Sequence, residues 1–178
     1  MPLISNKQWR AKVSDCTNID KLGNWVNGIW YKGTWEYGVW KDGVWLDGVW
    51  RNGNWRNGTW HKGIWKGGTW TDGKWLDGVW LGGDWDKGIW HNGTWHRGIF
   101  MDAHWLNGTW LNGDFFYWAT WHDGTWVRGN WNDGALWLNG KWESGWIGDY
   151  DNSRITKVSP KCFYKPKPTL SLNYANYK

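Results

Sequence analysis

The sequence repeats with a period of five residues through most of its length, and this period restricts the folds open to it. From Gly23 to Trp146 the pattern is Gly-x-Trp-x-x, as in GNWVN, GIWYK and GTWEY. A period of five matches neither the 3.6 residues of a helical turn nor the two of a strand. The tryptophans can therefore be equivalent only if the chain turns once in every unit.

The pattern contains 25 units, of which 23 have Trp at the centre. Centres follow every fifth residue from Trp25 to Phe115. One extra residue moves the next centre to Trp121, a second moves it to Trp137, and one deletion places the last at Trp146. Because burying an indole removes roughly 150–250 Å² from water, the repeated rings are expected to share an interior. The predicted structural core comprises Trp25, Trp30, Trp35, Trp40, Trp45, Trp50, Trp55, Trp60, Trp65, Trp70, Trp75, Trp80, Trp85, Trp90, Trp95, Phe100, Trp105 and Trp110.

Two all-β folds turn every five residues. A narrow β-meander of three-residue strands is favoured by the Asn-Gly and Asp-Gly pairs, which are typical hairpin signals. A β-solenoid instead stacks parallel strands about 4.8 Å apart. The Gly two places before each centre is replaced only by Ala103, Ala119, Ala135 and Ser144. We interpret this as a requirement for small size rather than for positive φ, because Ala substitutes poorly where φ is positive. The expected fold is therefore the β-solenoid, with the meander as the alternative.

The residue before each centre predicts the number of sides per coil. It is β-branched at every tenth position, in Ile29, Val39, Val49, Thr59, Thr69, Val79, Ile89, Ile99 and Thr109, while the interleaved positions are mixed. A true repeat of ten requires an even number of sides. We therefore expect four sides, about six coils and a rod about 30 Å long, with the β-branched residues on two opposite outer walls.

A small residue followed two places later by a large apolar one, every five residues, resembles the pentapeptide-repeat family. That family has Ala-(Asp/Asn)-Leu-x-x, and here Gly replaces Ala while Trp replaces Leu. The resemblance implies a right-handed, four-sided β-solenoid in which both marked residues face inward. Compact repetitive β-structures of this kind also look like accessory structural proteins of tailed phages and other virus particles.

The organisation and charge of the chain divide it into three parts. Residues 1–22 are expected to form an N-terminal cap, 23–148 the solenoid, and 149–178 an extended basic tail rich in Pro, Lys and Tyr. Residues 23–150 carry a net charge of only −2, while 151–178 carry +5. A phosphate-binding face needs clustered cations, so we expect no nucleic acid on the repeat body. The expected contacts with other protein subunits are Phe116, Tyr117, Trp118, Lys161, Tyr164, Lys165, Lys167, Tyr174 and Tyr177.

The sequence contains no catalytic constellation, so we expect neither an enzyme nor a bound cofactor or metal. His61, His91, His96 and His122 directly follow a centre and His104 precedes one, which are outward positions. Cys16 and Cys162 are too few for a disulfide scaffold or a Cys-based zinc site. No apolar run approaches the ~20 residues of a membrane span, and the N-terminus lacks the apolar stretch of a secretion signal.

These features favour a non-enzymatic structural protein, a rigid rod that docks to other subunits through its tail. The resemblance places it in a virion; without it, a cytoplasmic location is expected. The alternative is a carbohydrate- or cell-wall-binding module. That function needs Trp rings on the surface, which leaves Trp118 and the aromatic break at Phe115-Phe116-Tyr117-Trp118 as candidates.

Overall fold

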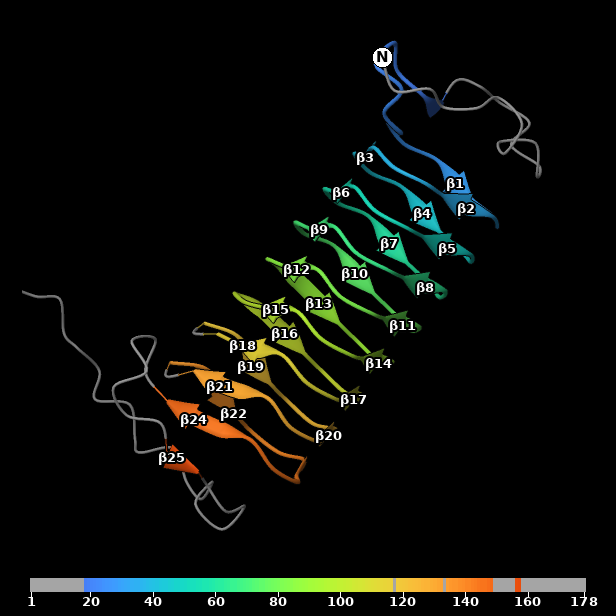
Figure 1. The fold of residues 1–178 in the computed structure, drawn as a ribbon. Helices are drawn as coiled ribbons and strands as arrows, with labels where there is room; N and C mark the ends of the chain where they lie inside the picture. Colours follow the sequence, from blue (N-terminus) through green and yellow to red (C-terminus); the bar gives the residue numbers. More distant parts are fainter. Residues whose placement is uncertain (1–17, 117, 133, 149–155, 158–178) are drawn as a thin grey trace, which may run out of the picture.

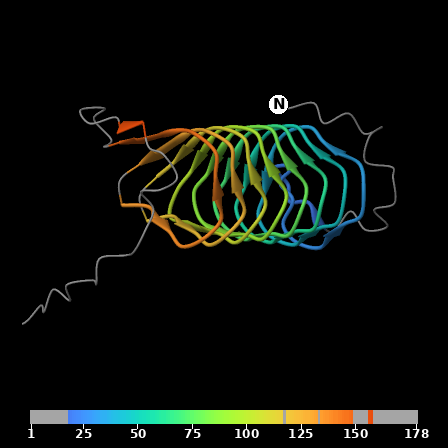
Figure 2. The same ribbon diagram turned by 90° about the horizontal axis from the view of Figure 1, so that it is seen from below.

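The protein is an all-β parallel β-solenoid of about eight turns, which confirms the predicted fold class and excludes the meander (Figure 1). The structure, a computed structural model, describes residues 18–116, 118–132 and 134–148 and the backbone of 156–157. Most of the predicted N-terminal cap and of the C-terminal tail therefore lies outside the described residues. Within them the chain forms no α-helix. The coils follow one another along a single axis (Figure 2).

Each unit from the second onward contributes one short strand to one of three sheets, while Trp25 of the first unit makes only isolated bridges. Sheet A contains β3 (Val39–Trp40), β6 (Asn54–Trp55), β9 (Thr69–Trp70), β12 (Asp84–Trp85), β15 (Ile99–Phe100), β18 (Asp114–Phe115), β21 (Asn130–Asn132), β24 (Trp146–Gly148) and β25 (Thr156–Lys157). Sheet B contains β1 (Ile29–Trp30), β4 (Val44–Trp45), β7 (Thr59–Trp60), β10 (Lys74–Trp75), β13 (Gly88–Trp90), β16 (Ala103–Trp105), β19 (Thr120–Trp121) and β22 (Leu136–Trp137). Sheet C contains β2 (Thr34–Trp35), β5 (Val49–Trp50), β8 (Ile64–Trp65), β11 (Val79–Trp80), β14 (Thr94–Trp95), β17 (Thr109–Trp110), β20 (Thr125–Trp126) and β23 (Lys141–Trp142).

The coil has three sides, so the expectation of four sides and six coils is wrong. Stacked strands pair three units apart in the first coils, as Ile29 with Val44 and Trp30 with Trp45. Later coils are longer by one residue, as in the pairing of Trp105 with Trp121. Sheets B and C each hold eight strands, and at about 4.8 Å per coil the rod is about 35 Å long. The β-branched pattern repeats every two units, whereas a coil contains three. The two repeats therefore come into phase only at every sixth unit, and the β-branched residues do not form two opposite walls.

The last unit is centred on Ile147 and not on Trp146. In the ladder between β21 and β24, Trp131 pairs with Ile147 while Trp146 pairs with Asn130. Ile147 packs against the core, whereas Trp146 is 49% exposed. The deletion predicted before Trp146 is therefore absent, and the small position of this unit is Gly145 instead of Ser144. An indole stands here on the outer face of the solenoid.

The core is a stack of aromatic rings that fills the lumen. Every residue predicted for the core is buried, and none is more than 4% exposed. Along each sheet the indoles stack almost parallel; Trp65 lies 4.8 Å from Trp50 and 4.7 Å from Trp80 between ring centroids, each at 5°. Around the coil successive rings meet edge to face, as Trp65 does with Trp70 at 6.0 Å and 71°. Both geometries are favourable for aromatic pairs, so the rings fill the interior without aliphatic partners.

This packing leaves most buried indole N–H groups without an acceptor. Trp90 Nε1 donates to the Asn107 carbonyl at 3.1 Å, and Trp126 Nε1 donates to the Ser144 carbonyl at 3.0 Å. Among the described residues, buried indoles such as Trp45, Trp60 and Trp75 have no such acceptor within hydrogen-bonding distance. Buried N–H groups are normally satisfied. The ring stack therefore determines the orientation of the indoles at the expense of these hydrogen bonds.

The corner glycines require both positive φ and the absence of a side chain, so the interpretation that size alone matters is wrong. From Gly28 onward the glycines two places before the centres have φ between +106° and +138°. They stack backbone on backbone: a Cβ built on Gly58 would overlap the Gly43 carbonyl and lie 3.0 Å from the Gly43 nitrogen. An L-residue is strained at such φ values. Both constraints therefore select glycine at this position.

The three alanines occur where the positive φ moves one residue upstream. Asp102, Trp118 and Gly134 precede them, with φ of 44°, 63° and 84°. Ala103 and Ala119 are buried, at 2% and 1% exposure. All three alanines lie at the corner between sheets A and B, in successive coils, and the two extra residues of the later coils also fall there. The corner thus changes its backbone conformation, which frees the next position for a methyl group.

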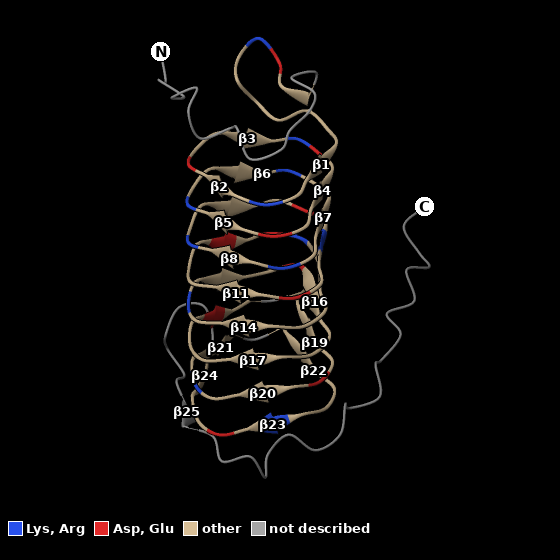
Figure 3. Cartoon of the chain, turned by 90° about the vertical axis from the view of Figure 1, so that its right-hand side faces the viewer, with Lys and Arg blue, Asp and Glu red and all other residues tan. Residues whose placement is uncertain are grey.

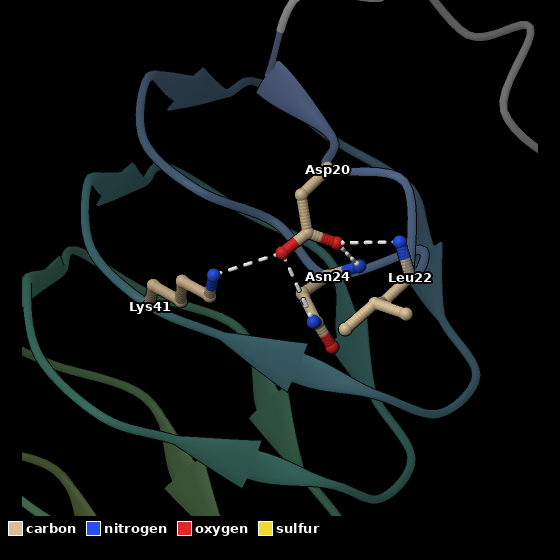
Figure 4. A network of polar contacts seen from close by, with 4 residues as sticks. All are labelled: Asp20, Leu22, Asn24 and Lys41. Carbon is tan, nitrogen blue, oxygen red and sulfur yellow. Dashed lines mark hydrogen bonds and ion pairs between the residues drawn. The ribbon is translucent and has the colours of Figure 1, made fainter.

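Antiparallel pairs lie at both ends of sheet A. At the C-terminal end β25 pairs antiparallel with β24 (Figure 1). At the N-terminal end Ile19 forms an antiparallel bridge with Trp25. Asp20 organises the turn between Ile19 and Trp25. Its carboxylate accepts hydrogen bonds from the backbone N–H groups of Leu22 and Asn24, at 2.9 and 3.0 Å. It also forms an ion pair with Lys41 at 2.8 Å (Figure 4). The hydrogen bond from Lys41, followed by those from Asn24, holds the pKa of Asp20 well below its ordinary value.

Replacing Asp20 with Asn is expected to loosen the first coil. A carboxylate with a lowered folded-state pKa stabilises the fold fully above its ordinary value of 3.8 and loses that effect as the pH falls through the folded-state value. Hydrogen exchange at pH 6 should therefore be faster at Leu22 and Asn24 in Asp20→Asn than in the wild type, and the difference in stability should shrink below about pH 4. Asp86→Asn, at a carboxylate without an ion pair among the described residues, is the control. Equal exchange in all three proteins would contradict this role.

Candidate functional site

The outer face of sheet C carries an unbroken row of β-branched residues. Thr34, Val49, Ile64, Val79, Thr94, Thr109 and Thr125 stack in consecutive coils. In Figure 3 this face lies toward the viewer, and its strands are uncharged from β2 to β20, with Lys141 in β23 as the first cation. Stacked β-branched side chains suit a parallel ladder. This row therefore gives one wall of the rod a continuous β-branched surface.

The five histidines lie outward, and three of them share one column. His61, His91 and His122 follow the indoles of sheet B, alternating in the stack with Leu46, Leu76 and Leu106. His122 Nε2 lies 3.4 Å from His104 Nδ1. Partial burial, and then the proximity of His104, lower the pKa of His122. Within the described residues no three His, Cys, Asp or Glu side chains gather as they would around a metal ion.

Large exposed apolar side chains gather at the two ends of the rod. Near the first coil these are Leu22, Val26, Ile29, Tyr31 and Tyr37, and in the last coils they are Trp118, Leu136, Leu138 and Trp146. Among the described residues the middle of the rod contributes only Ile64, at 38% exposure. The ends are therefore chemically different from the wall between them.

A shallow groove of about 350 Å³ lies at the C-terminal end, at the corner between sheets C and A. It is lined by Asn112, Arg128, Gly129, Asn130, Ser144, Gly145 and Trp146. These residues come from three successive coils, so the ladder itself sets their spacing. A second groove of about 360 Å³ includes Asp42, Asn57 and Asp72, and no aromatic side chain lines it.

The polar groups of the Trp146 groove retain free hydrogen-bonding capacity. Asn130 Nδ2 donates to Asp114 Oδ1 at 2.6 Å, which fixes the amide and leaves its oxygen as an acceptor. The Ser144 hydroxyl donates to the Val127 carbonyl at 2.7 Å and can still accept. Within the described part of the chain, the side chains of Asn112 and Arg128 have no hydrogen-bond or ion-pair partner. In eight other corners an Asn or Asp side chain instead bonds to the N–H of the following glycine, as Asn107 does to Gly108 at 2.7 Å.

The predicted partner contacts are only partly within the described chain. Trp118 is 72% exposed at the corner between sheets A and B, and its backbone N–H donates to the Gly134 carbonyl at 3.2 Å. Phe116 is half-buried beside it. Tyr117, Lys161, Tyr164, Lys165, Lys167, Tyr174 and Tyr177 lie outside the described residues. The sequence analysis did not single out Trp146 as a surface residue, because it assumed a one-residue deletion that placed Trp146 at the centre of the last unit.

Comparisons with protein-family models, with curated proteins and with solved structures found no match for this chain. None of the described segments is a helix with the length and apolar character needed to cross a membrane. The function is therefore inferred from the geometry of the chain.

Proposed function

We propose that this chain is a non-enzymatic structural protein, a rigid rod that assembles with other protein subunits through its ends and its C-terminal tail. The observation that carries the proposal is the placement of exposed apolar side chains. Leu136 and Leu138, at 45% and 51% exposure, lie in the last coils, and Leu22, at 81%, lies before the first. Exposed apolar side chains that gather in patches are typical of interaction surfaces.

The body of the rod supports this assignment. Each coil is bonded to the next by a parallel ladder, as Leu46 N to Trp30 O and Arg51 N to Trp35 O, both at 2.8 Å. The rings of the lumen stack without interruption from Trp25 to Trp142. A body of this kind keeps its length and presents its ends in a fixed orientation, which suits a spacer or plug within a larger particle. We place it in a virion on its resemblance to such components, with the cytoplasm as the alternative.

The test is to isolate the tagged full-length chain from its native source, cross-link it and identify the bound chains by mass spectrometry. We expect the wild type in a complex and Leu138→Asp largely released, because a buried unpaired carboxylate is costly. Ile64→Asp, which places a carboxylate on the middle of the wall instead, should remain in the complex. A wild-type chain that stays monomeric, or equal release by both variants with unchanged melting, would overturn docking through the end.

The tail is tested separately by reversing its charge in the full-length chain. Lys161→Glu, Lys165→Glu and Lys167→Glu together should weaken association if the basic tail docks to an acidic surface. The same triple variant should melt as the wild type does, since the coils hold the core without the tail. Unchanged association would assign docking to the coil ends alone.

A further inference from the structure

We propose that the groove around Trp146 binds a saccharide unit, with the indole as the stacking platform. This inference does not rest on the assembly role and concerns a different surface chemistry. It begins from the register of the last unit, in which Ile147 takes the inward place and Trp146 is turned to the outer face of sheet A.

An outward indole is unusual in this chain. None of the other outward residues of sheet A is aromatic; they are Val39, Asn54, Thr69, Asp84, Ile99, Asp114 and Asn130. Every other described tryptophan except Trp118 belongs to the lumen units. Trp146 is half exposed and lines a groove, so its ring offers a flat apolar surface to a ligand.

The polar groups around the ring have the chemistry of hydroxyl recognition. Asn112, with its planar amide, and Arg128, with its guanidinium, both line the groove from corners that follow sheet C. Asn130 and Ser144 keep acceptor oxygens after their own hydrogen bonds are made. A sugar ring presents C–H groups on one face and hydroxyls at its edge. Such a ligand can therefore cover the indole while its hydroxyls donate to the acceptors and accept from Arg128 and Asn112.

The test is a printed array of neutral hexose, N-acetylhexosamine and uronate oligosaccharides probed with the full-length chain. The strongest binder is then titrated by calorimetry against the wild type and variants. Trp146→Ala should weaken binding by about tenfold or more, because an aromatic contact and its buried area are both lost. Arg128→Ala should weaken it in the same direction. Trp118→Ala removes an even more exposed indole, at 72% against 49% for Trp146, that lies outside the groove, and it should leave binding unchanged.

Each result decides the proposal. Binding lost in Trp146→Ala and kept in Trp118→Ala, with equal melting temperatures, supports the site. An array with no bound oligosaccharide overturns it, and so does equal binding by the wild type and Trp146→Ala. An equal loss of binding in both tryptophan variants would indicate nonspecific binding to exposed aromatic rings, and it would also overturn the proposed site. The assembly test would stand in each case, because its readout is the co-purifying chain and its variant is Leu138→Asp.

Discussion

Gly68→Ala is expected to destabilise the solenoid by about 3–5 kcal/mol. Gly68 has φ +106°, and a Cβ there would overlap the carbonyl of Gly53 and lie 2.8 Å from its nitrogen. The strain of an L-residue at positive φ and the overlap with a rigid neighbouring backbone each cost about 1–3 kcal/mol. Because the glycines stack directly, the coils can accommodate the methyl group only by separating. Thermal and denaturant unfolding followed by circular dichroism measures the loss.

Gly67→Ala is the matched control, one residue earlier in the same corner. Gly67 has no positive φ, and the nearest atom to its Cβ would be the Arg51 carbonyl oxygen at 3.8 Å. Alanine at such a position reduces the entropy of the unfolded chain, so stability should stay equal or rise by up to about 1 kcal/mol. If the two variants were equally stable, the stacked-glycine corner would be wrong.

Trp65→Ala should cost about 3–5 kcal/mol, the usual range for removing a buried large aromatic side chain. Trp65 is fully buried in the middle of the rod, between Trp50 and Trp80 along its column and against Trp60 and Trp70 around the coil. Rigid parallel ladders on all sides limit the collapse of the cavity. Denaturant unfolding of the full-length chain gives the free energy.

Trp65→Phe provides a graded control if Trp65→Ala fails to fold. Phenylalanine already occupies the lumen at Phe100 and Phe115, where the rings stack at 5.0 Å and 11°. The Phe variant keeps ring contact and should lose about half as much stability as the Ala variant. No loss in either variant would contradict the inward position of this ring.

The period of five determined the fold class because it leaves few ways to keep the rings equivalent. It restricted the fold to a solenoid or a meander, since no helix or strand repeats at that interval. The solenoid was then preferred because the residue two places before each centre is small, and the reason given, size without positive φ, is wrong. The outward position of Trp146 was missed, because a deletion and an unbroken unit centred on Ile147 fit the same letters. The only sequence signal for it was Gly145, which keeps the glycine in register with Ile147.

The number of sides per coil was predicted wrongly, because β-branched residues at every tenth position were taken as the repeat and the β-branched residues at the interleaved positions were disregarded. Four interleaved positions are β-branched, and three of them, Thr34, Ile64 and Thr94, lie on sheet C. Along sheet C, Thr34, Ile64 and Thr94 follow one another at intervals of two full coils. The positive φ of the glycines was also missed, because Ala103, Ala119 and Ala135 hide a change in the preceding residue. Sequence letters do not record which of two neighbours takes the left-handed conformation.

Because the coils are nearly identical in sequence, their strands could pair in more than one register. The unequal lengths of the coils remove this ambiguity. Coils that end before Phe115 consist of three regular units, and those that cross the A–B corner after it are longer by one residue. A chain that slipped by one whole coil would set a longer turn beside a shorter one and leave a residue with no place in the ladder. It would also carry Phe100 and Phe115 past their own column neighbours. The longer C-terminal coils thus distinguish one register of an otherwise repetitive molecule from the others.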